Sequence, residues 1–448
     1  MLSVLGIILF ILSIIFLLQR KYFYSTLLYT FFATRGLSII PEELGFIKLS
    51  HLAFFYTIVF VILNKEKLII AYRNYKSIKY LLWVIIYFIC SIAFSVLYYG
   101  FPVIDTIITG SRYIVLLSFF VFYKIDLPEY SKLMKFLFYI TFYTSILYCL
   151  QCVTGVQLLA YSLEVYDVPT ENGLFRFYNN PPLCGLFLYC SFFYKDIIPK
   201  RYRFLAPIVF IMVVFLSNGR TAIAVTIFSL LLIAFFTKNK KVVLWAIMFV
   251  GILFLSVQSL IMSRFDNGGK TFEDINLVAS GKFYEADYQS KNGYTMLYRF
   301  AWVYERWNYL MERPIVEPLF GLGLLTDENP IIQQKYHFRY GLINPDTGNV
   351  AQIRTPDISW GNFLTCFGIL GSIYFFIFYF NLLKEANYKR KYENLFIIIY
   401  VCLITTILES FSASSLSEPY SLVGMFLFFN FANKKYIYGQ NNNNNSLL

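Results

Sequence analysis

Charged residues are scarce in this 448-residue chain. They make up 14% of it, whereas hydrophobic residues make up 58% and the mean hydropathy is +0.59. A water-soluble domain carries roughly 25% charged residues, so this chain has too little polar surface to cover a soluble fold. The shortage excludes a disordered protein, a nucleic-acid-binding domain and an ordinary cytoplasmic enzyme. It indicates an integral membrane protein with many spans.

Histidine is also scarce, and cysteine lacks any pattern. The two histidines are His51 and His337, which excludes a multi-histidine metal site. The seven cysteines all lie in or beside apolar runs, and no pair has the spacing of a zinc or redox site. We therefore expect buried thiols without a disulfide framework, no cofactor, and chemistry that does not depend on a metal ion.

Long apolar runs are plentiful, and they predict an all-α polytopic membrane protein with about 13 transmembrane helices. The candidate spans are 2–18, 22–40, 44–63, 80–98, 104–123, 133–154, 179–194, 204–217, 220–236, 242–262, 359–383, 394–411 and 419–433. The chain then divides into spans 1–10 (residues 1–262), one large loop (263–358), spans 11–13 (359–433) and a low-complexity cytoplasmic tail (434–448). The asparagine run at 441–445 in that tail predicts disorder.

Basic residues are distributed unevenly over the links between these spans. Alternate links and the tail hold 23 of the 38 lysines and arginines, and the opposite links and span ends hold five. Because basic residues collect on the cytoplasmic side, the N-terminus is predicted to face outward. The loop 263–358, with 12 acidic and 10 basic residues, is then extracytoplasmic.

One stretch of the large loop has the pattern of an amphipathic helix. From Thr295 to Arg313 the apolar residues recur at helical spacing, and Pro314 ends the pattern. We expect this helix to lie on the membrane surface or to cap the bundle.

Five arginines are predicted to lie on the outer side, where charge within or beside a span is costly. They are Arg35, Arg112, Arg176, Arg220 and Arg299. Guanidinium groups bind phosphate oxygens in pairs, so a cluster of them suits a diphosphate. The alternative is that each arginine reaches lipid headgroups or pairs with a nearby acid, such as Arg112 with Asp105.

Three segments carry a resemblance to a known superfamily. They are Arg176-Phe177-Tyr178-Asn179-Asn180-Pro181-Pro182, Ser217-Asn218-Gly219-Arg220-Thr221-Ala222, and a third that begins at Arg299, passes through Pro318-Leu319-Phe320-Gly321-Leu322-Gly323 and closes at Pro356-Asp357-Ile358-Ser359-Trp360-Gly361-Asn362. In their order and their placement on one side, they resemble the O-antigen polymerase and O-antigen ligase superfamily of bacterial membrane glycosyltransferases. The resemblance covers roughly 175–375. Ligases of this superfamily have a His-Asn pair where Asp357-Ile358 stands here, and this departure favours a polymerase.

The resemblance implies glycan transfer from undecaprenyl diphosphate to a second lipid-linked oligosaccharide, at the outer face of the bacterial plasma membrane. The product would be O-antigen, capsule or exopolysaccharide, and a chain-length regulator is a possible partner. The rivals are a ligase, which transfers the glycan to lipid A core or protein, and a lipid-linked oligosaccharide flippase.

The chemistry of such a transfer assigns roles to the candidate residues. Arg220 and Arg299 would stabilise the leaving diphosphate, with Arg176, Arg112 and Arg35 as further diphosphate ligands. Asp357 would act as the base, unless it merely caps the following helix. His337 and Glu305 are the alternative bases. The loop aromatics that could contact sugar are Trp302, Trp307, Tyr336, Tyr340 and Trp360.

Overall fold

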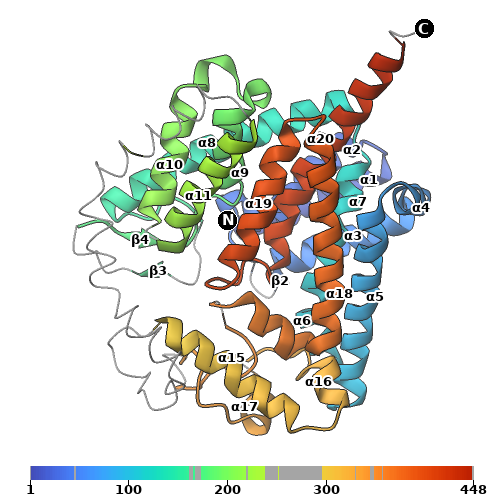
Figure 1. Ribbon diagram of the computed structural model, residues 1–448, viewed down its shortest axis with the longest axis vertical. Coiled ribbons are helices and arrows are strands. Elements are labelled where there is room, and N and C mark those ends of the chain that lie inside the picture. Colours follow the sequence, from blue (N-terminus) through green and yellow to red (C-terminus); the bar gives the residue numbers. More distant parts are fainter. Residues whose placement is uncertain are drawn as a thin grey trace.

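The computed structural model describes most of the chain. It describes residues 2–44, 47–160, 165–166, 173–217, 220–237, 251, 295–327, 329–343, 348–355 and 357–445. These residues are mostly helical, with two short strand pairs, and the helices form a bundle (Figure 1). The predicted all-α class is therefore confirmed.

Four helices among the described residues are long and apolar enough to cross a membrane. They are α5 (Lys76–Leu97), α8 (Leu127–Thr154), α18 (Ser359–Lys389) and the continuous stretch Val103–Tyr123. That stretch consists of α6 (Val103–Ile114), a 3-10 turn (Val115–Leu117) and α7 (Ser118–Tyr123).

The remaining bundle helices are mainly apolar but shorter, apart from the polar link helix α4 and the long C-terminal helix α20. They are α1 (Leu2–Leu18), α2 (Tyr22–Ala33), α3 (Leu49–Leu63), α4 (Lys65–Asn74), α9 (Cys184–Phe193), α10 (Leu205–Leu216), α11 (Arg220–Thr237), α19 (Leu395–Glu409) and α20 (Pro419–Asn445). Short 3-10 helices occupy Arg35–Ser38, Lys195–Ile197 and Lys200–Tyr202. The count of about 13 spans is not confirmed, because only four helices of the described residues are both long and apolar enough to cross a membrane. The predicted span 242–262 lies outside the described residues except for Gly251.

Two antiparallel strand pairs interrupt the helical pattern. Strand β1 (Glu43–Leu44) pairs with β2 (Ile47–Lys48), and β3 (Val165–Tyr166) pairs with β4 (Arg176–Phe177). Each strand has two residues, which is too short to produce an alternating pattern in the sequence.

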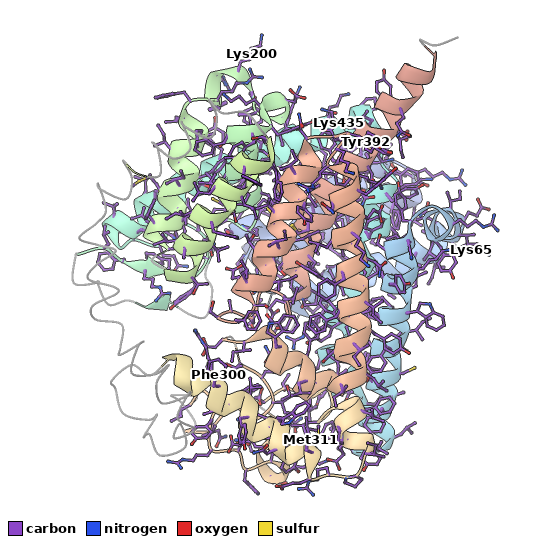
Figure 2. The ribbon with its side chains drawn as sticks, viewed as in Figure 1. Lys65, Lys200, Phe300, Met311, Tyr392 and Lys435 are labelled. Carbon is purple, nitrogen blue, oxygen red and sulfur yellow. The ribbon has the colours of Figure 1, made fainter. Side chains whose placement is uncertain are left out.

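The two ends of the bundle differ in character. Figure 2 places Lys200, Tyr392 and Lys435 near one end, and Phe300 and Met311 at the opposite end. The second end carries α15 (Thr295–Met311), α16 (Val316–Phe320) and α17 (Pro330–Lys335). The amphipathic helix predicted between Thr295 and Arg313 is confirmed as α15, which ends just before Pro314.

Helix α18 is kinked at Gly368, where the backbone has φ +64°. A Cβ atom at this position would collide with the backbone of Leu319 and Gly321, so the site accepts only glycine. The kink interrupts the hydrogen bonds within the helix, and the carbonyl groups beside it accept hydrogen bonds from other segments instead. The Thr365 carbonyl accepts from the Leu322 N–H at 2.6 Å, and the Phe367 carbonyl accepts from the Tyr87 hydroxyl at 2.7 Å. The loop around Gly321 is thereby inserted against the span.

The C-terminal segment departs from the expectation of disorder. Helix α20 continues to Asn445, through the asparagine run. Its preceding turns are anchored because Asn433 is buried and accepts a hydrogen bond from Lys389 of α18. The helix therefore extends from a fixed base, which reduces the cost of adding turns.

Candidate functional site

Two of the predicted catalytic residues lie together. The Arg299 Nη2 atom of α15 is 3.4 Å from the Asp357 Oδ1 atom, which stands just before α18. The two side chains are 18% and 31% exposed, so the pair is partly accessible from outside. Arg299 and Asp357 are 58 positions apart in the sequence. Their contact therefore joins two distant parts of the third segment that resembles the polymerase and ligase superfamily.

Asp357 does not cap the helix that comes after it. The residue at the N-cap of α18 is Ile358, and no side chain makes a capping hydrogen bond there. The Asp357 N–H donates to the Thr355 hydroxyl at 3.2 Å, while the carboxylate faces Arg299. The carboxylate is therefore available to the site.

Asp327 holds the segment that leads to Asp357. Its Oδ1 atom accepts from the N–H groups of Gln352 and Ile353, both at 2.6 Å, and its Oδ2 atom accepts from the Arg354 N–H at 3.2 Å. Burial raises the pKa of Asp327 to about 6, although the backbone donors and the nearby arginines Arg306 and Arg112 oppose the shift. Three successive backbone donors on one carboxylate set the path of this segment.

Asn362, in the first turn of α18, anchors the same segment from the other side. Its amide accepts from the Thr355 N–H at 2.9 Å and donates to the Thr355 carbonyl at 2.7 Å. It also donates to the Ser417 hydroxyl at 3.1 Å. Asn362 is 6% exposed, so these bonds form in a buried setting where each missing partner is costly.

The serine-rich turn, residues 410–418 between α19 and α20, forms hydrogen bonds to α18 and α11. The Ser410 carbonyl accepts from the Ser359 N–H at 3.1 Å, and the Ser359 hydroxyl donates to the Ala413 carbonyl at 2.8 Å. The Ser412 hydroxyl donates to Thr221 of α11 at 3.0 Å. The predicted diphosphate ligand Arg220 is the first residue of α11, adjacent to Thr221, and its side chain lies outside the described residues. The turn therefore connects the Arg220 segment to the start of α18.

Three arginines around this site keep buried nitrogen atoms without a hydrogen-bond partner in the described part of the chain. They are Arg112 (Nε), Arg299 (Nε) and Arg354 (Nε and Nη2). Arg354 lies between the two anchored residues Ile353 and Thr355. Buried guanidinium donors without a partner are costly, so these atoms suit an anionic ligand.

Arg112 does not form the ion pair with Asp105 that the sequence left open as an alternative. Asp105 accepts instead from the Asn329 side chain at 3.1 Å. The Arg112 guanidinium lies 5.1 Å from the centre of the Tyr113 ring and acts electrostatically on Glu418 of the serine-rich turn and on Asp327. Arg112 therefore belongs to the same neighbourhood as the segment 352–357.

Arg35 and Arg176 are placed differently. Arg35, at φ +51°, lies 3.5 Å from Glu42, and both side chains are about half exposed. Arg176 lies on β4 with its guanidinium 4.7 Å from the centre of the Tyr178 ring, and its buried Nε has no partner in the described part. Within the described residues, no hydrogen bond or ion pair joins either arginine to Arg299 or Asp357.

The two alternative bases have unequal surroundings. Glu305 accepts from the backbone N–H groups of Arg339 at 2.7 Å and Tyr340 at 3.1 Å, and it pairs with Arg306 at 2.7 Å. Through these bonds the Glu305 carboxylate fixes the loop at 339–340. His337 is exposed between two buried aromatic residues.

Arg306 is fully buried, which was not predicted from the sequence. Its guanidinium lies between the rings of Trp302 and Phe338, 4.3 and 4.4 Å from their centres, and it donates to the Gln352 carbonyl at 3.1 Å. The helical spacing of the sequence could have indicated this burial, because Arg306 is four residues from both Trp302 and Leu310 on the buried face of α15. For Asp327 and Arg354 no comparable spacing exists in the sequence, since their neighbours come from distant segments.

The loop aromatics proposed as sugar contacts are mostly buried. Trp302, Tyr336 and Tyr340 belong to the interior, and Trp360 stacks on Phe376 with ring centres 4.2 Å apart. Trp307 is 41% exposed and remains on the surface.

Among the described residues, no group of three or more His, Cys, Asp or Glu side chains could hold a metal ion. No protein-family model matches this sequence, and no curated protein matches it significantly.

Proposed function

We propose that the protein is a membrane glycosyltransferase of the polysaccharide-polymerase type. It transfers a glycan from undecaprenyl diphosphate to a hydroxyl group of a second lipid-linked repeat unit, at the outer face of the bacterial plasma membrane. The pairing of Arg299 with Asp357, beside arginine nitrogens that lack partners in the described part of the chain, is the observation that carries this proposal.

The reaction requires a base and a charge stabiliser close to each other. The acceptor hydroxyl oxygen attacks the anomeric carbon of the donor, and the bond from that carbon to the diphosphate oxygen breaks. The electron pair leaves with the diphosphate, and the hydroxyl proton passes to the Asp357 carboxylate. The guanidinium groups of Arg299 and Arg354, with Arg112 and Arg220, stabilise the charge that develops on the leaving group.

The membrane setting supports the choice of a lipid-linked donor. Four of the described helices can span a bilayer, and the Arg299–Asp357 pair lies at one end of the bundle beside α18, one of those spans. A substrate with an apolar tail and a diphosphate head would present its head at such a position.

The test uses purified protein in proteoliposomes with a single substrate, undecaprenyl-diphosphate-linked repeat units. A polymerase produces a ladder of longer lipid-linked chains, because the same molecule serves as donor and acceptor. Asp357→Asn provides the matched control, since it keeps the shape of the side chain and loses the basic oxygen. Absence of a ladder from wild-type protein, with transfer to lipid A core or protein on their addition, would indicate a ligase instead.

A further inference from the structure

Helix α15 carries an exposed stripe of large apolar side chains. The apolar stripe consists of Phe300, Trp307 and Met311, which are 51%, 41% and 41% exposed, and of Ile315 just beyond the helix, which is 71% exposed. The intervals of seven and four residues place the helical members on one face. Such a contiguous face marks an interaction surface rather than scattered surface residues.

The stripe cannot turn inward, because the opposite face of α15 is fixed. Trp302, Arg306 and Leu310 are fully buried, and Arg306 donates to backbone carbonyls of the segment 351–352. Rotating the helix to bury the stripe would break these bonds and expose a paired, buried arginine. The described residues therefore leave the stripe uncovered.

The stripe leads toward an exposed apolar surface at the end of the spanning helix α5. Beyond Ile315, α16 packs on the end of α5, where Phe320 lies over Phe94 with ring centres 4.7 Å apart and the Tyr99 hydroxyl donates to the Gly321 carbonyl at 2.6 Å. Leu97 at that end of α5 is 84% exposed. Figure 1 shows α16 against this end of α5, with α15 running across the same end of the bundle.

We propose that α15 lies in the plane of the membrane interface, with the apolar stripe inserted among the lipid chains next to the headgroups. Phe, Trp, Met and Ile together fit lipid better than they fit a sugar, since Met and Ile offer no flat ring for stacking. Trp is favoured at the membrane interface, and the exposed Arg313 at the end of the helix can reach phosphate groups. Because Arg299 directly precedes Phe300, this docking holds the Arg299–Asp357 pair at headgroup depth. The inference does not depend on the proposed glycosyl transfer.

The test measures the depth of single labels in the full-length protein reconstituted in bilayers. Cys90 is exposed and Cys149 is half-buried, so Cys90→Ser and Cys149→Ser are made first. A fluorophore is then attached at Met311→Cys or, separately, at Ile315→Cys. Glu312→Cys, exposed on the neighbouring face of the same turn, is the matched control, and Leu97→Cys reports an exposed position on the spanning helix α5.

Lipids brominated near the headgroup end of their chains should quench the labels at Met311 and Ile315, and aqueous iodide should not. The Glu312 label should show the reverse pattern. Quenching of the Met311 and Ile315 labels by iodide alone would overturn the proposal. Protection of both labels from lipid and iodide alike would also overturn it, because a protein partner or a second copy would then cover the stripe. Quenching of the Leu97 label by lipid verifies that the reconstituted protein is inserted, and an unchanged elution profile in detergent verifies that each labelled variant is folded.

Discussion

Exchanging the charges of Arg299 and Asp357 separates a structural ion pair from a catalytic one. The double variant Arg299→Asp/Asp357→Arg can rebuild an ion pair across the same 3.4 Å contact, yet it removes the base from the end of α18 and the cation from α15. Both side chains are partly exposed, so the pair itself contributes about 1 kcal/mol or less, which is about fivefold in a rate or an equilibrium.

Catalytic roles predict much larger losses. Removing a charge stabiliser of a developing anion costs about 10²–10³ in rate, and removing a general base costs about 10²–10⁴. Arg299→Ala and Asp357→Asn should each lower the initial rate of chain extension in proteoliposomes by at least about a hundredfold. The exchanged variant should be as inactive as either single variant.

The control is Arg339→Ala, which removes an exposed arginine of the same loop and should leave the rate unchanged. Losses of only about fivefold in the single variants, with recovery in the exchanged variant, would assign the pair to holding the loop against α18 and would refute the catalytic reasoning.

Three further predictions concern the residues around the pair. Asn362→Leu leaves the Thr355 N–H and the Thr355 carbonyl without a partner, at about 1–3 kcal/mol for each buried group, so the unfolding temperature in detergent should fall and the loop should be cleaved faster by protease. The folded pKa of Asp327, about 6, lies above its ordinary value of 3.8, so the folded loop binds this proton more tightly than the unfolded chain does. Its resistance to protease should therefore rise as the pH falls from about 6 to about 4, and Asp327→Asn should abolish that dependence. Arg354→Met should raise KM for the lipid-linked donor, and Arg354→Lys should recover it only in part because lysine lacks the planar fork.

Local properties of the sequence predicted the local features of the fold. Hydropathy located the helices of the bundle, because apolar composition over about 20 residues is sufficient for a membrane span. Helical spacing followed by Pro314 located α15 to within two residues at its end. The lengths of the helices were predicted less well. Helices α9 and α10 have only 10 and 12 residues, and an apolar run does not reveal where its helix ends.

The candidate site depends on contacts between distant segments, and these were predicted only in part. The resemblance of separate motifs indicates Arg299 and Asp357 individually, whereas their contact is formed only in the fold. Arg306 and Arg299 both belong to α15. Arg306 is buried and donates to the Gln352 carbonyl, whereas Arg299 pairs with Asp357 at the site. In the sequence Arg35 resembled the other outer arginines, but a left-handed backbone and Glu42 place it on the surface.

The kink at Gly368 limits how this protein can be recombined with others. The carbonyl groups of Thr365 and Phe367 in α18 accept hydrogen bonds from Leu322 of the loop and from Tyr87 of α5. Thr365 and Phe367 are fully buried, so water cannot replace these partners. A chimera that exchanges the loop alone would leave the Thr365 carbonyl unpaired unless the incoming loop carries its own close-approaching glycine turn. The natural unit of exchange therefore contains the loop together with α5 and α18, and chimeras between proteins of this architecture should be joined at the far ends of those two helices.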